Sequence, residues 1–103
     1  MPRLAHHVFF TLKDRSPAAQ DTLVAACKKY LDEHPGLIDF SVGRRDPELD
    51  RPVNGDFDVS LHCIFDSRAS HDVYQAAPRH MAFIEETQAT WAEVRVFDSI
   101  LEG

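Results

Sequence analysis

Three side chains in this sequence have the chemistry of an acid–base site: His6, Tyr74 and His80. Histidine titrates near neutral pH and can accept or donate a proton, while a tyrosine hydroxyl can donate a hydrogen bond to an oxygen atom. His6 interrupts an apolar strand row, and Tyr74 and His80 flank Pro78, which breaks a helix. If all three point inward, His80 can remove a proton next to a carbonyl while Tyr74 hydrogen-bonds to the enolate oxygen.

Apolar residues are expected to complete this cleft. The predicted ligand-binding residues besides His6 are Val8, Phe10, Val59, Phe83, Trp91, Val94 and Val96. An apolar pocket with a few converging polar groups is the usual form of a small-molecule site. The alternative is structural, because a lone histidine is more often a hydrogen-bonded core or rim residue and a tyrosine or tryptophan a core aromatic. The prediction depends on the coincidence of three polar groups.

Metal and thiol chemistry have weaker support. His6 and His7 are adjacent on a strand, so their side chains point to opposite faces and cannot chelate one ion. A metal site would need His6, His80 and a third ligand that the pattern does not identify. Cys27 and Cys63 are too few for a disulfide scaffold or a thiolate zinc site. We therefore expect neither a metal nor another cofactor.

Composition predicts one globular domain over residues 1–103. The formal net charge is −6, which disfavours binding to nucleic acid or to an anionic membrane. No apolar run approaches the ~20 residues that span a bilayer, and no signal-peptide core follows the first residues. Together with the low cysteine count, these features predict a cytoplasmic protein.

The elements that position the cleft follow from hydrophobic periodicity. Alternation predicts strands over 4–12, 37–43, 57–65 and 92–101. Capping residues and helical spacing predict helices from 16–17 to about 34, from 66 or 67 to about 76, and over about 79–90. The polar segment 44–56, which contains Asn54-Gly55, is expected to be a loop. This βαββαβ order predicts an α+β ferredoxin-like sandwich with the helices on one face of the sheet.

The opposite face of the predicted sheet carries three large apolar residues, Phe9, Ile64 and Phe97, among polar ones. An exposed apolar patch of this size is typical of an interface, so we expect a homodimer that packs sheet against sheet. The alternative is a solvated face, which antiparallel sheets tolerate.

Over nearly its whole length the sequence resembles the stress-responsive A/B barrel domain family. The resemblance is carried by the segments 6–13 (HHVFFTLK), 57–67 (FDVSLHCIFDS), 74–80 (YQAAPRH) and 91–98 (W…VFD). It implies a dimeric α+β barrel, in which the sheets of two chains form the barrel and the helices lie outside.

The resemblance also bears on function. One plant member of the family cyclises a linear polyketide by an aldol reaction, and its catalytic tyrosine and histidine have the spacing of Tyr74 and His80, while a pocket histidine corresponds to His6. This chain has Ala77 and Val59 at two positions where that enzyme has histidines. The resemblance implies a cofactor-free cyclase-like or lyase-like enzyme for a small carbonyl compound. The alternative is a non-catalytic dimeric stress or accessory protein with a vestigial pocket.

Overall fold

The computed structural model describes residues 2–53 and 55–103, so Asn54 of the expected turn lies outside the described residues. The strands are β1 (Leu4–Leu12), β2 (Leu37–Arg44), β3 (Val59–Phe65) and β4 (Trp91–Ile100). The helices are α1 (Pro17–Tyr30), α2 (Arg68–Ala76) and α3 (Pro78–Thr87), with a final 3₁₀ turn η1 (Gln88–Thr90). The strands form one antiparallel sheet in the order β2-β3-β1-β4, which confirms the predicted ferredoxin-like α+β fold.

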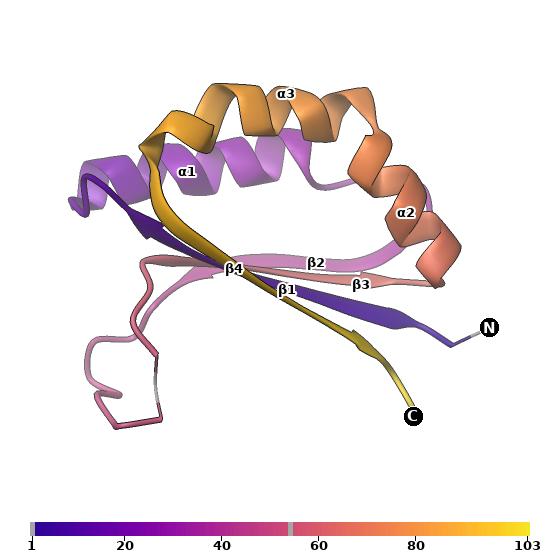
Figure 1. Ribbon diagram of the computed structural model, residues 1–103, viewed down its shortest axis with the longest axis horizontal. Coiled ribbons are helices and arrows are strands. Elements are labelled where there is room, and N and C mark those ends of the chain that lie inside the picture. The colour runs from indigo at the N-terminus through magenta and orange to yellow at the C-terminus, as the bar shows by residue number, and fades with distance from the viewer. Residues whose placement is uncertain (1, 54) are drawn as a thin grey trace.

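The helices cover one face of the sheet and leave the other open (Figure 1). α1 and α3 lie side by side above the sheet, and α2 descends toward the end where β1 begins. The core fills the space between the two layers, and its fully buried side chains include Phe10, Leu31, Phe65 and Tyr74. Burial of each side chain of this size contributes about 1.5–3 kcal/mol. Among the described residues, none of the helices is long and apolar enough to cross a membrane.

α1 ends at Tyr30, earlier than the predicted end near residue 34. Glu33 has a φ of +59°, which a continuing helix cannot contain. The ring of His34 turns back, and its Nε2 donates a hydrogen bond to the carbonyl of Tyr30 at 2.7 Å. The His34 side chain thus occupies the carbonyl of Tyr30, to which a backbone N–H of the next helical turn would otherwise bind. The helix therefore ends at this point.

Gly36 follows this helix end with a φ of +80° and no room for a side chain. A Cβ at this position would lie 2.4 Å from the Cβ of Ser70. We expect Gly36→Ala to lower the free energy of unfolding by about 1–3 kcal/mol or more, because a left-handed backbone and a steric clash are combined. Urea denaturation measures this. Gly43→Ala is the matched control, since the nearest atom to its Cβ, Ser60 Oγ, is 3.6 Å away; an equal loss in both variants would contradict the prediction.

The start of β2 contains a register shift between Leu37 and Asp39. Simple alternation places Ile38, Phe40 and Val42 on one face, but the shift turns Ile38 outward, where it is 54% exposed. Phe40 and Val42 still pack against the core, together with Leu37. Ile38 therefore departs from the simple alternation, because a bulge resets it at the strand end.

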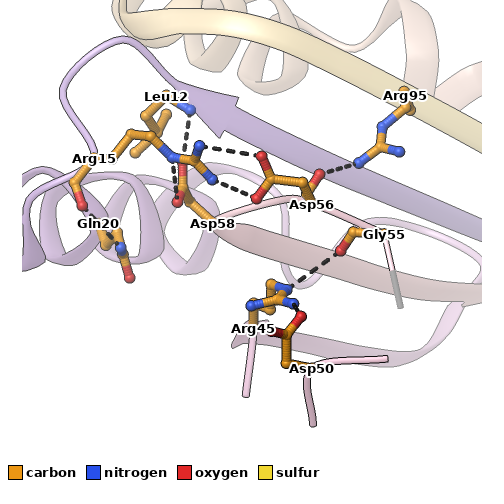
Figure 2. A network of polar contacts seen from close by, with 9 residues as sticks. All are labelled: Leu12, Arg15, Gln20, Arg45, Asp50, Gly55, Asp56, Asp58 and Arg95. Atoms are coloured by element: carbon orange, nitrogen blue, oxygen red, sulfur yellow. Dashed lines mark hydrogen bonds and ion pairs between the residues drawn. The ribbon is translucent and has the colours of Figure 1, made fainter. Parts of the chain in front are cut away.

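β3 begins two residues later than alternation predicts, and this reverses the faces assigned to Phe57 and Asp58. The pattern places Phe57 on the helix side, but its ring packs against Phe9 of the open face, with ring centroids 5.1 Å apart. The pattern places Asp58 on the open face, yet it is buried. Its carboxylate accepts hydrogen bonds from the backbone N–H of Leu12 at 2.8 Å and from Nε of Arg15 at 3.0 Å (Figure 2).

Arginines tie the loop between β2 and β3 to the sheet (Figure 2). Arg15 forms an ion pair with Asp56 at 2.7 Å, and Arg95 of β4 donates to the carbonyl of Asp56. Arg45 donates to the carbonyl of Gly55 at 3.3 Å. The loop lies on the side of the open face (Figure 1), so these bonds hold the loop along one border of that face.

Candidate functional site

A cleft of about 340 Å³ lies between the sheet and the α2–α3 layer, and it brings His6, Tyr74 and His80 together. His6 comes from β1, Tyr74 from the last turn of α2, and His80 from the first turn of α3. The rings of Tyr74 and His80 are 4.7 Å apart between centroids, and those of His6 and Tyr74 are 6.0 Å apart. The geometric part of the sequence prediction, that these side chains meet in one cavity of one chain, agrees with the structure.

The break between the two helices creates this arrangement. Ala77 has an extended backbone, with φ −66° and ψ 141°, and Pro78 occupies the first position of α3. A proline is favoured there because the first helical N–H has no partner within the helix. The change of direction at Ala77 lets Tyr74 and His80 face each other although they belong to different helices.

All but one of the predicted apolar lining residues contact the same cleft: Val8, Phe10, Phe83, Trp91, Val94 and Val96. Val59 does not line it, because it is completely buried in the core, and Leu61 of the same strand lines the cleft instead. Val94 and Val96 lie on the expected side of β4 but are 40% and 49% exposed. β4 is an edge strand, so these two valines form the open side of the cleft and are not part of the core.

Unpaired polar atoms inside the protein are concentrated in this cleft. The hydroxyl of Tyr74, Nδ1 of His80 and Nε1 of Trp91 are buried and have no hydrogen-bond partner among the described residues. A buried polar group without a partner costs about 1–3 kcal/mol, so native proteins retain few of them. A bound molecule with oxygen atoms would satisfy these donors and acceptors.

Burial sets the protonation of the two central groups. It raises the pKa of Tyr74 far above its ordinary value, so the hydroxyl keeps its proton and acts as a donor. Burial also lowers the pKa of His80, and the nearby imidazoles of His6, His34 and His71 lower it further, while an interaction with the backbone of Gln75 opposes these effects. His80 is therefore neutral at pH 7 and can accept a proton.

His6 is held by a partner that the sequence prediction missed. Its Nδ1 and Oδ1 of Asp98 are 2.5 Å apart, and the two residues are opposite each other in the β1–β4 register. Burial lowers the pKa of His6, and the hydrogen bond with Asp98 opposes this effect. Asp98 could have been found from the alternation of β4, since it follows Val94 and Val96 on the inner face.

His71 is the second missed residue of the cleft, and it lies one turn before Tyr74 on α2. Its ring centroid is 5.0 Å from that of His6. The sequence pattern predicts His80 as the second ligand that a metal would need. In the structure the potential ligand atoms that lie together are those of His6, His71 and Asp98. The remaining lining residues that were not predicted are Leu31, Leu61, Gln75 and Ile84.

Lowered histidine pKa values predict the direction in which stability changes with pH. Burial lowers the pKa of His7 and His80 below 6.5 in the folded chain. As the pH falls below 6.5, the unfolded chain binds more protons than the folded chain, so stability decreases. We expect thermal melts to show a lower Tm at pH 5 than at pH 7.5. The carboxylates of Asp14, Asp56 and Asp66 have lowered pKa values and titrate below this window; a Tm that is constant from pH 7.5 to 5 would contradict the prediction.

Comparison with known proteins identifies the fold and a family description. A protein-family model described as the stress-responsive A/B barrel domain matches residues 4–101. A search of curated protein sequences found no match. The match to the family model covers every strand and helix, and with them the whole cleft.

Solved structures share the fold at low sequence identity. A Dabb family protein with a ferredoxin-like fold from Mesorhizobium loti is 23% identical, with a TM-score of 0.82 and 100% of both chains covered. A dimeric ferredoxin-like protein of unknown function from Thermobifida fusca is 21% identical, with a TM-score of 0.82 and coverage of 97% of this chain and 92% of that one. A hydroxynitrile lyase from Passiflora edulis is 19% identical, with a TM-score of 0.80 and coverage of 98% and 94%.

Proposed function

The chain belongs to the stress-responsive A/B barrel domain family, and we propose that its cleft binds a small carbonyl compound and transfers a proton at the carbon next to the carbonyl. The observation that carries this proposal is the set of unpaired polar atoms at Tyr74, His80 and Trp91 within one mainly apolar cleft. A carbonyl compound offers both an oxygen acceptor for the donors and an acidic C–H bond for a base.

The roles of the two central groups follow from their protonation. His80, neutral at pH 7, takes the proton as the C–H bond breaks, and the electron pair moves onto the carbonyl oxygen to form an enolate. Tyr74, protonated by virtue of its burial, donates a hydrogen bond to that oxygen. Enolisation of this kind begins aldol cyclisations; in the reverse direction, which cleaves a carbon–carbon bond, the same base would take the proton of a hydroxyl group. The structural similarity to a hydroxynitrile lyase supports a lyase-like reaction class.

An open cleft favours this function over a vestigial pocket. If Phe10, Phe83 and Trp91 filled the space, the chain would be only a dimeric scaffold. Their rings do pack together, with centroids 5.3 Å apart for Phe10 and Trp91 and 6.1 Å apart for Phe83 and Trp91. A space of about 340 Å³ is nevertheless left beside them, within the usual range of ligand pockets.

We propose that the active unit is a homodimer that covers the open sheet face. Phe9 and Phe97 lie on this face with ring centroids 6.0 Å apart, and Phe97 is 56% exposed in one chain. Ile64 lies on the same face, where it is opposite Ala5 in the β1–β3 register. A second copy would bury this patch, and the description of the Thermobifida fusca protein as dimeric supports this arrangement.

The proposed location of the protein is the cytoplasm. The two buried free cysteines, Cys27 and Cys63, fit that reducing compartment.

A thermal-shift screen of small ketones, aldehydes and β-dicarbonyl compounds tests the proposed function. A ligand present at ten times its Kd adds about 1.4 kcal/mol of stability, which raises the Tm of a domain of this size by several degrees. We expect compounds that stabilise the parent to lose about 40–70% of their stabilising effect on Tyr74→Phe, as a Kd raised 3- to 10-fold implies. His62→Gln is the control, because His62 faces the open side of the sheet. Equal shifts in Tyr74→Phe and the parent for every compound would contradict binding at this cleft.

A further inference from the structure

Potential metal ligands lie together at the His6 end of the cleft, next to the Tyr74 ring, whose centroid is 6.0 Å from that of His6. One nitrogen or carboxylate oxygen from each of His6, His71 and Asp98 lies within 4.8 Å of the other two. They come from β1, α2 and β4, so the fold and not a local motif brings them together.

We propose that His6, His71 and Asp98 bind one divalent transition-metal ion, for which Zn²⁺ is the natural probe. Two imidazoles and one carboxylate are a common ligand set for such ions, and three ligands leave coordination positions open. Bond lengths of about 2.0–2.2 Å place neighbouring ligand atoms roughly 3.0–3.5 Å apart. The present spacing is therefore within 1–2 Å of a binding geometry, and rotation of Asp98, whose side chain is 41% exposed, can supply that movement.

Access and charge also suit a cation at this position. His71 and Asp98 line a second cavity of about 290 Å³ as well as the main cleft, so an ion has a route from solvent. The side chain of Asp98 is 41% exposed and that of His6 only 5%, which makes His6 the fixed inner ligand and Asp98 the mobile outer one. Arg68 is the cation nearby, and it is paired with Asp72 at 3.8 Å.

The contacts of His71 determine which of its ring nitrogens can act as a ligand. Its Nδ1 lies 3.3 Å from Oδ1 of Asp72, and its Nε2 lies 3.3 Å from Nε2 of Gln75. Because the carboxylate only accepts and the amide nitrogen only donates, Nδ1 carries the proton and Nε2 has the free electron pair. A carboxylate behind a histidine in this way is the typical outer partner of a metal-bound imidazole. The metal would displace the Gln75 amide.

The His6–Asp98 hydrogen bond is compatible with this exchange. Nδ1 of His6 now donates its proton in a hydrogen bond to Oδ1 of Asp98 at 2.5 Å. A metal would take the place of that proton, which moves to the other ring nitrogen, and both atoms would become ligands. The sequence-based expectation of no metal site depended on His6, His7 and His80, and it did not include His71 and Asp98.

Direct titration of the protein without an affinity tag, after dialysis against EDTA, tests the proposal. Calorimetry with Zn²⁺ and visible absorption with Co²⁺ should show one ion per chain. His71→Ala and Asp98→Asn should each weaken binding by more than about 100-fold, and Asp72→Asn by about 10-fold. His80→Ala and His62→Gln are the controls and should bind as the parent does.

These outcomes separate the metal site from the proposed reaction, because none of them measures activity. Both ligand variants change side chains at the edge of the cleft, and the amide of Asp98→Asn can still accept the hydrogen bond from His6, so circular dichroism should show an intact fold. Failure of the parent to bind Zn²⁺ or Co²⁺, or binding by His71→Ala and Asp98→Asn as tight as that of the parent, would overturn the proposal.

Discussion

His80→Ala is expected to reduce turnover of a carbonyl substrate by about 10²–10⁴-fold, the usual contribution of a positioned general base. His80 is the neutral imidazole next to Tyr74, and its Nδ1 has no partner among the described residues. Since the side chain is only partly buried, its removal should change the free energy of unfolding little. Steady-state kinetics on a compound found in the thermal-shift screen would measure the loss.

Two further variants make this prediction specific. Tyr74→Phe removes the donor to the enolate oxygen and should reduce turnover by about 10²–10³-fold, as expected for one oxyanion donor. His62→Ala removes a histidine from the open face and should leave turnover unchanged. Turnover by His80→Ala equal to that of the parent would exclude His80 as the base and favour a binding function for the cleft.

Phe9→Asp is expected to convert the dimer into monomer or aggregate. Phe9 lies between Phe57 and Phe97 on the open face, with ring centroids 5.1 Å and 6.0 Å away. A second copy on this face would bury the new carboxylate beside Arg95, which is opposite residue 9 in the β1–β4 register and whose guanidinium already donates to the carbonyl of Asp56. Burial of the added charge at the interface costs several kcal/mol. Sedimentation velocity at several concentrations measures the change.

A second variant and a control keep this test independent of folding. Phe97→Glu changes a side chain that is 56% exposed in the single chain, so it should weaken the dimer without weakening the core. Val73→Asp places a charge on α2, at a residue that is 61% exposed and lies on the helix layer. It should leave the dimer intact. A stable, soluble dimer of both Phe9→Asp and Phe97→Glu would refute the open face as the interface.

The fold could be predicted because strand faces follow a period of two and β1 obeys that period over its whole length. Two of the failures occur where a side chain forms a hydrogen bond that the pattern does not reveal. Asp58 turns inward to bind the backbone of Leu12, which shortens β3, and His34 binds the last turn of α1, which ends that helix early. The first bond joins residues that only the folded chain brings together, and the second depends on the turn that the chain makes at Glu33 after the helix.

The candidate site could be predicted in part for the same reason. His6, Tyr74 and His80 belong to elements whose faces are set by local periodicity and by the break at Pro78. Asp98 and His71 reach the cleft through the β1–β4 register and the rotation of α2 above the sheet. Val59 was misplaced because the inner face of a strand includes both core and cleft positions, and periodicity does not distinguish them.

The intrinsic fluorescence of Trp91 gives the most direct test of the central claim, because it is the only tryptophan in the sequence and it lines the cleft. Titration with a stabilising carbonyl compound should change its emission in a saturable way. Loss of one hydrogen bond in Tyr74→Phe should raise the Kd by about 3- to 10-fold, and His62→Gln should leave it unchanged. A ligand that stabilises the protein without changing Trp91 emission, or that binds Tyr74→Phe and the parent equally, would contradict the assignment of this cleft as the functional site.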